Sequence, residues 1–103
     1  MLSIHRVRGD SMSPSLCDGD FIVSFKGRLR RYKVDDIVVV QHSLYGVIVK
    51  RIKEVYPTDS FALIGDNPTS TSTEQMGTIE KNAIIGRVVL HIRRPHLPAR
   101  NAP

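Results

Sequence analysis

The chain has 103 residues, a net charge of +5 and 41% hydrophobic residues. This length fits one domain with a single small core, and the apolar fraction excludes disorder everywhere except at the ends. No apolar run approaches the roughly 18 residues of a membrane span, and no export leader is visible, so we expect a cytoplasmic protein. The single cysteine, Cys17, excludes an internal disulfide and a multi-cysteine zinc site.

Short β-type runs separated by turn residues make up most of the chain, and no segment has a sustained apolar period of 3.6 residues. The predicted strands cover residues 2–8, 20–25, 36–41, 45–55, 60–64 and 83–93. A helical turn is predicted at residues 14–16, and a hairpin connection at residues 42–46. We therefore expect a mainly β fold with little helix, a small coiled and partly open antiparallel sheet or half-barrel. It would form one domain over residues 1–94, followed by a flexible tail at residues 95–103.

A basic segment lies between the second and third predicted strands. Residues 26–33 contain five cations and a single aromatic residue, Tyr32. Such a segment is either a solvated hairpin loop or a docking patch for an acidic partner. Because bases stack on aromatic side chains, one tyrosine makes nucleic acid a less favoured partner.

The first candidate functional residue is Ser11, in the sequence Gly-Asp-Ser-Met-Ser-Pro at residues 9–14. Gly9 permits either a positive φ or a close approach of the backbone, and Pro14 excludes a strand interior. At such a bend the backbone amides of Asp10 and Ser11 could point outward together and stabilise an oxyanion. The alternative is an ordinary polar turn that contains a serine.

Lys50 is the second candidate, because it lies in a predicted strand where alternate residues share a face. Ile48, Lys50 and Ile52 fall on one face of that strand. A lysine held between two isoleucines loses hydration of its charged form, which lowers its pKa. The pattern alone also permits a charged Lys50 that reaches solvent from an edge strand.

A bend-mounted serine and a neutral lysine form a nucleophile and a general base. In this reading Lys50 accepts the hydroxyl proton as Ser11 attacks a carbonyl. A Ser-His-Asp arrangement would instead need one of the four histidines, and no spacing favours any of His5, His42, His91 and His96. We therefore predict a Ser/Lys dyad.

The chain resembles the Ser/Lys peptidases that include LexA-like self-cleaving domains and type I signal peptidases. Six motifs carry the resemblance in order, at residues 7–14, 17–23, 35–40, 49–52, 65–68 and 84–89. It implies a serine endopeptidase without metal or cofactor that binds a protein or propeptide as an extended strand. The implied catalytic residues are Ser11 and Lys50, with the backbone amides of Asp10 and Ser11 as the oxyanion hole. The implied groove and support residues are Gly9, Met12, Asp66, Asn67 and Ser70.

Two departures from the family pattern narrow this expectation. Residues 70–77 lack the aspartate and arginine that support the active site of signal peptidases. Ser11 lies ten residues after Met1, so we expect no preceding DNA-binding domain, self-cleavage segment or membrane anchor. The resemblance is then closest to small soluble stand-alone members, such as the maturation proteases of nickel-type superoxide dismutase, which process a precursor. The competing hypothesis is a degenerate peptidase fold that binds peptide or regulates a partner without cutting.

Overall fold

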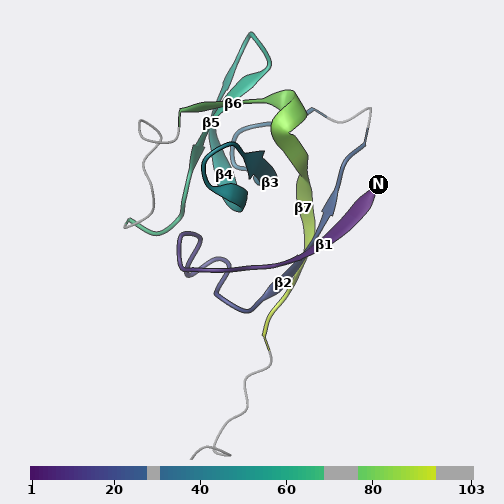
Figure 1. The fold of residues 1–103 in the computed structure, drawn as a ribbon, viewed down its shortest axis with the longest axis vertical. Coiled ribbons are helices and arrows are strands. Elements are labelled where there is room, and N and C mark those ends of the chain that lie inside the picture. The colour runs from purple at the N-terminus through teal and green to yellow at the C-terminus, as the bar shows by residue number, and fades with distance from the viewer. Residues whose placement is uncertain (28–30, 69–76, 95–103) are drawn as a thin grey trace, which may run out of the picture.

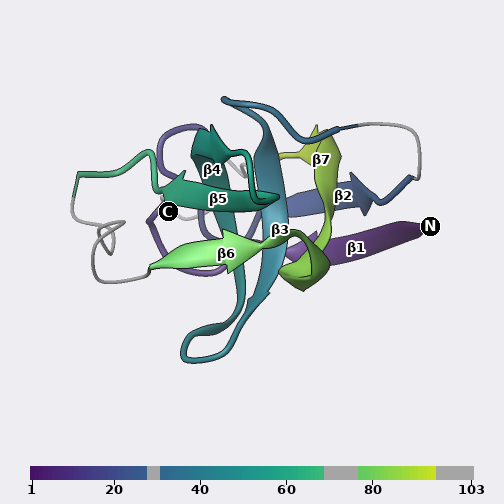
Figure 2. The ribbon, with the colours of Figure 1, turned by 90° about the horizontal axis from the view of Figure 1, so that it is seen from above.

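The computed structural model describes residues 1–27, 31–68 and 77–94, and within them the chain forms one antiparallel sheet. The sheet order is β1-β2-β7-β3-β4-β5-β6, so β1 and β6 are its edges and the sheet is open. Figures 1 and 2 show the sheet strongly coiled. The strands are β1 (Leu2–Arg6), β2 (Phe21–Phe25), β3 (Ile37–His42), β4 (Gly46–Tyr56), β5 (Ser60–Ile64), β6 (Thr78–Glu80) and β7 (Ile84–Ile92). The predicted fold class, a partly open antiparallel β sheet with little helix, is confirmed.

All six predicted strands are present, with ends that differ from the prediction by two residues or fewer. The hairpin at residues 42–46 is also confirmed, since His42 pairs with Gly46 where β3 turns into β4. The sequence missed β6 and the 3-10 helix Lys81–Ala83 that follows it. With Ile79 as its one buried residue, β6 is too short to show an alternating pattern.

The helical turn predicted at residues 14–16 is present as part of a single turn that starts at Met12. The backbone N–H of Leu16 donates to the carbonyl oxygen of Met12 at 2.8 Å, so the turn begins two residues earlier than expected. No helix forms there. The predicted tail, residues 95–103, lies outside the described residues, and the domain boundary at residue 94 stays a prediction.

Two apolar clusters form the core because the coiled sheet buries side chains on both faces of its central strands. Val38, Val40 and Ile52 belong to one cluster, whereas Val39 and Met12 belong to the other. This explains the uninterrupted apolar run in β3, where successive valines enter opposite clusters. Within the described ranges, no helix has the length and apolar character needed to cross a membrane.

The basic segment at residues 26–33 lies partly outside the described residues. One of its cations is committed to the fold, since the Lys26 Nζ donates to the carbonyl oxygen of Ile84 at 3.0 Å. Tyr32 packs edge-on against Phe61, with ring centroids 6.0 Å apart. Lys26 and Tyr32 therefore serve packing in this structure, and a docking role for the segment stays a prediction.

Candidate active site

Ser11 lies in the loop that connects β1 to β2, and Gly9 sets the direction of that loop. Gly9 has a φ of +78°, whereas a Cβ at this position would meet nothing within 4 Å. Of the two uses considered for Gly9, the left-handed backbone conformation therefore applies and close approach does not. The Gly9 N–H donates to Asp18 Oδ1 at 2.8 Å, which joins the two ends of the loop.

The backbone around Ser11 is held on one side and open on the other. The N–H of Asn67 donates to the Ser11 carbonyl oxygen at 2.9 Å, so the segment after β5 supports the serine directly. Neither the N–H of Asp10 nor that of Ser11 bonds to another residue that the structure describes. An oxyanion hole formed by these two amides stays a prediction.

Lys50 is buried in β4, with only 4% of its surface exposed. It pairs with Val38 of the buried cluster, and the neighbouring residues on its face are Ile48 and Ile52. Burial in these surroundings lowers the pKa of Lys50 below its ordinary value of 10.5. Of the two interpretations that the pattern left open, the desolvated lysine is correct and the solvent-reaching lysine is wrong.

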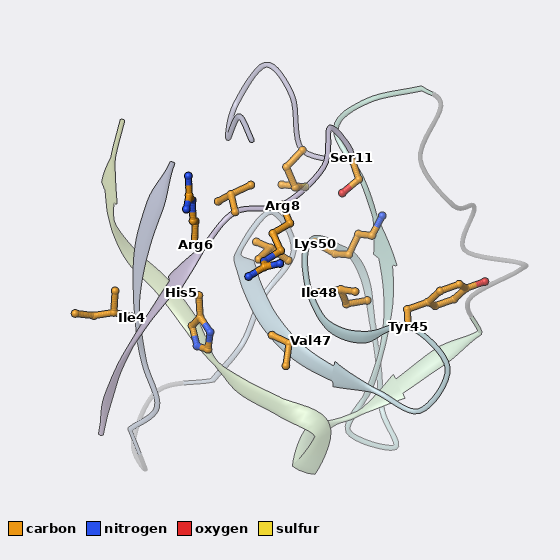
Figure 3. A pocket seen from close by; sticks show the side chains of 12 residues that line it. Ile4, His5, Arg6, Arg8, Ser11, Tyr45, Val47, Ile48 and Lys50 are labelled. Carbon is orange, nitrogen blue, oxygen red and sulfur yellow. The ribbon is translucent and has the colours of Figure 1, made fainter. Parts of the chain in front are cut away.

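Ser11 and Lys50 line the same groove, which has a volume of about 490 Å³. In Figure 3 the Ser11 hydroxyl and the Lys50 amine point toward the same part of this groove. Met12 also lines it, while packing almost completely buried in the core. The geometry thus places a hydroxyl and an amine of lowered pKa in one groove, a combination suited to acyl transfer.

Two strand edges border the groove. Residues of β1 pair with β2 on one side only, and the first half of β4, up to Lys50, pairs with β3 but not with β5 among the described residues. Unpaired edges offer backbone donors and acceptors to an added strand. The groove can therefore accommodate an extended peptide.

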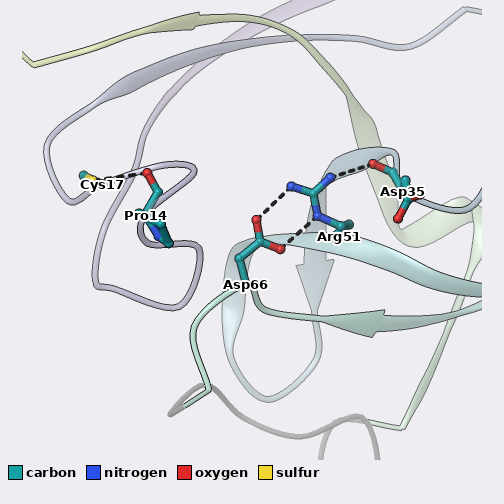
Figure 4. A network of polar contacts seen from close by, with 5 residues as sticks. All are labelled: Pro14, Cys17, Asp35, Arg51 and Asp66. Atoms are coloured by element: carbon teal, nitrogen blue, oxygen red, sulfur yellow. Dashed lines mark hydrogen bonds and ion pairs between the residues drawn. The ribbon is translucent and has the colours of Figure 1, made fainter.

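Arg51 lies on the face of β4 opposite Lys50 and makes polar contacts with two other segments. Its Nε and one terminal nitrogen donate to the two carboxylate oxygens of Asp66, both at 2.8 Å, and the other terminal nitrogen donates to the Asp35 carbonyl oxygen at 3.0 Å (Figure 4). Hydrogen bonds from Arg51, and secondarily from Ser15, lower the pKa of Asp66. Because Asn67 follows Asp66 and bonds to Ser11, this ion pair links the strand of the lysine to the loop of the serine.

The model of the family described as Peptidase S24-like matches residues 2–89, which is most of the chain. The chain belongs to the Peptidase S24-like family. None of the curated proteins matches it significantly. The matched range includes the loop of Ser11, the strand of Lys50 and the Asp66 segment, and this agrees with the resemblance to LexA-like and signal peptidases.

Arg51 is a residue next to the candidate site that the sequence analysis did not single out. Arg51 of β4 forms an ion pair with Asp66, which lies just after the end of β5. No local sequence signal indicates this contact, which follows from the register: Arg51 pairs with Ile64 at the end of β5, two residues before Asp66. The other predicted support residue, Ser70, lies outside the described residues.

The histidines do not assemble a Ser-His-Asp triad with Ser11 in the described residues. His91 bonds to Asp20 at 2.7 Å, but this pair lines a different pocket together with the exposed Cys17. His42 accepts hydrogen bonds from the backbone of its own turn. His5 lines the groove, yet no described carboxylate bonds to its ring. His96 lies outside the described ranges.

Proposed function

We propose that this protein is a serine endopeptidase in which Ser11 is the nucleophile and Lys50 the general base. The observation that carries the proposal is the burial of Lys50 in the groove that Ser11 shares. No described acid pairs with Lys50, and burying its charged form unpaired is costly, so burial favours the neutral amine that a general base requires. Membership of the Peptidase S24-like family supports the same activity.

In the proposed mechanism, neutral Lys50 accepts the hydroxyl proton while the Ser11 oxygen attacks the substrate carbonyl. The N–H groups of Asp10 and Ser11 donate to the oxyanion of the tetrahedral intermediate. Lys50 then returns the proton to the leaving amine, which gives an acyl-enzyme. Attack by water, activated by the same lysine, releases the acid product and restores Ser11.

The substrate we propose is a protein segment or propeptide that binds as an extended strand along β1 and the first half of β4. Both edges lack a second strand partner in the described part of the sheet, which supports this mode of binding. A soluble, cytoplasmic protease that matures a precursor, like those of nickel-type superoxide dismutase, is the narrower proposal. A candidate precursor that stays uncut on co-expression would count against it.

The test is the pH dependence of cleavage of a mixed peptide library by the wild type, Ser11→Ala and Lys50→Ala. We expect kcat/KM to rise with pH through a pKa below that of an ordinary lysine. Each substitution should reduce it by about 10³-fold or more. Cleavage that survives in either variant would contradict the dyad.

The competing function is peptide binding without cleavage. Comparing the wild type with Ser11→Ala separates the two functions. A binding module should bind the same peptides in both proteins and should leave them intact. A wild type that binds library peptides for hours without any change in their mass would favour the competitor.

A further inference from the structure

The described residues that line the groove include basic side chains but no acidic one. Among the described residues that line it, four are basic and none is acidic; the basic ones are His5, Arg6, Arg8 and Lys50. The nearest acid in the sequence is Asp10, which is exposed and does not line the groove. A groove lined by charge of one sign raises the local concentration of ligands of the opposite sign.

The basic side chains other than Lys50 lie on one wall of the groove. The β1 wall supplies His5, Arg6 and Arg8, whereas the wall from the β3–β4 hairpin supplies Tyr45 and three aliphatic residues, Val47, Ile48 and Val49, before reaching Lys50. An extended peptide alternates its side chains between two sides. A peptide strand that pairs with these edges directs its side chains to the two faces of the sheet, so those on the face where Arg8 lies meet a cation.

Arg8 is the cation of the β1 wall for which the described residues show no partner. The Arg6 guanidinium lies over the Phe21 ring, 5.9 Å from its centroid, so Arg6 already has a cation–π partner. The exposed Arg8 guanidinium forms no ion pair with an acid in the described ranges. Its side chain extends into the groove between those of His5 and Lys50 (Figure 3).

We propose that the groove selects acidic peptide segments and that Arg8 is its specificity-determining residue. The selection of acidic cleavage sites rests on the proposed function, whereas the binding of acidic peptides does not. A substrate carboxylate beside Arg8 gains a charge-assisted hydrogen bond. Arg8 also compensates the charge of that carboxylate, which would otherwise favour the protonated form of Lys50 and oppose its role as a base.

The binding experiment uses Ser11→Ala protein, so that no peptide is cut, and two fluorescent nine-residue peptides. One peptide alternates alanine and glutamate, and the other replaces each glutamate by glutamine. We expect the glutamate peptide to bind about threefold to tenfold more tightly by fluorescence anisotropy at low salt, as for partly exposed ion pairs. This preference should shrink to near unity in Ser11→Ala/Arg8→Gln. The matched control is Ser11→Ala/Arg31→Gln, which removes an exposed arginine outside the groove and should retain the preference.

The outcomes separate the inference from the proposed function. Equal affinity for the two peptides, no binding of either up to millimolar concentration, or equal losses in the Arg8 and Arg31 variants would overturn the inference. In wild-type protein, cut sites in the mixed library should be enriched in Asp and Glu within four residues, and Arg8→Glu should shift them toward Lys and Arg. Cleavage without this enrichment would leave the peptidase standing and overturn the inference. An Arg8-dependent preference for the acidic peptide without any cleavage would support the inference and count against the peptidase.

Discussion

Ser11 and Lys50 reach the same groove by different means. Lys50 lies in the middle of a strand, and its position follows from pairing with Val38 and from its isoleucine neighbours. Ser11 lies in a loop outside the sheet, where hydrogen bonds between Gly9 and Asp18 and between Asn67 and Ser11 hold the backbone.

Because the two residues are held differently, substitutions should affect stability and catalysis differently at Lys50 and around Ser11. Burying the Lys50 amine lowers the stability of the fold, and an apolar side chain in its place would remove that cost. Strand pairing does not position Ser11. Its position depends on hydrogen bonds that the backbone of its loop forms with Asp18 and Asn67. Changes at the lysine should therefore affect chemistry and raise stability, while changes at remote supports should displace the serine.

The largest effect we expect beyond the dyad itself comes from breaking the Arg51–Asp66 ion pair. Arg51→Met or Asp66→Asn should lower kcat/KM by about tenfold to 100-fold, because small displacements of a nucleophile are costly to catalysis. The loss should appear mainly in kcat, and Arg51→Lys should restore only part of it, since lysine cannot form the two-pronged contact.

The control for this prediction is Arg87→Met, which removes another arginine that faces a carboxylate, Asp36, outside the groove. The double variant of Arg51 and Asp66 should lose no more activity than either single variant, as expected for partners in one contact. Additive losses, or an equal loss in Arg87→Met, would remove Arg51 from the site.

The next effect concerns Asp20, which fixes the far end of the serine loop. Its carboxylate accepts hydrogen bonds from the backbone of Arg94 and Cys17 and from His91, and these contacts lower its pKa from 3.8 to about 2. Asp20→Asn should reduce the free energy of unfolding by on the order of 2 kcal/mol, a typical loss for hydrogen bonds to a charged group.

The stabilisation from Asp20 has a defined pH window. Because the folded pKa lies below the unfolded one, the contribution is complete above pH 3.8 and is lost as the pH falls toward 2. Urea unfolding of the wild type and Asp20→Asn across this range measures it. A difference between the two proteins that stays constant down to pH 2 would contradict the assignment.

The smallest effect is a gain in stability in Lys50→Met. The unfolded chain keeps the lysine proton up to the ordinary pKa of 10.5, whereas the folded chain releases it at lower pH. Wild-type stability should therefore rise with pH toward 10.5, and at pH 7 Lys50→Met should be more stable by on the order of 1 kcal/mol.

Urea midpoints at pH 7 and pH 9.5 test this prediction, with Lys53→Met as the control for an exposed lysine on the same strand. The gain for Lys50→Met should be larger at pH 7 than at pH 9.5, and Lys53→Met should show neither effect. A Lys50→Met protein that is less stable than the wild type would mean that the amine is stabilised by contacts rather than merely buried.

The sequence by itself determined the features that depend on local pattern. Alternation along residues 45–55 placed Lys50 between two isoleucines on a buried face, and turn residues separated six strands close to their observed ends. The residue type of Gly9 indicated either a positive φ or a close backbone approach, and the structure was needed to choose the positive φ. These features were predictable because strand periodicity and backbone preference act over a few neighbouring residues.

Only the tertiary structure decided the contacts between distant segments. Alternation puts Arg51 on the face opposite Lys50, and nothing local indicates that Asp66 meets it there or that Asn67 bonds to the Ser11 backbone. The three-residue strand β6 was invisible for the same reason, since its pairing with β5 rather than its own pattern makes it a strand. Such contacts arise from the order and coiling of the strands, which bring together residues far apart in the sequence.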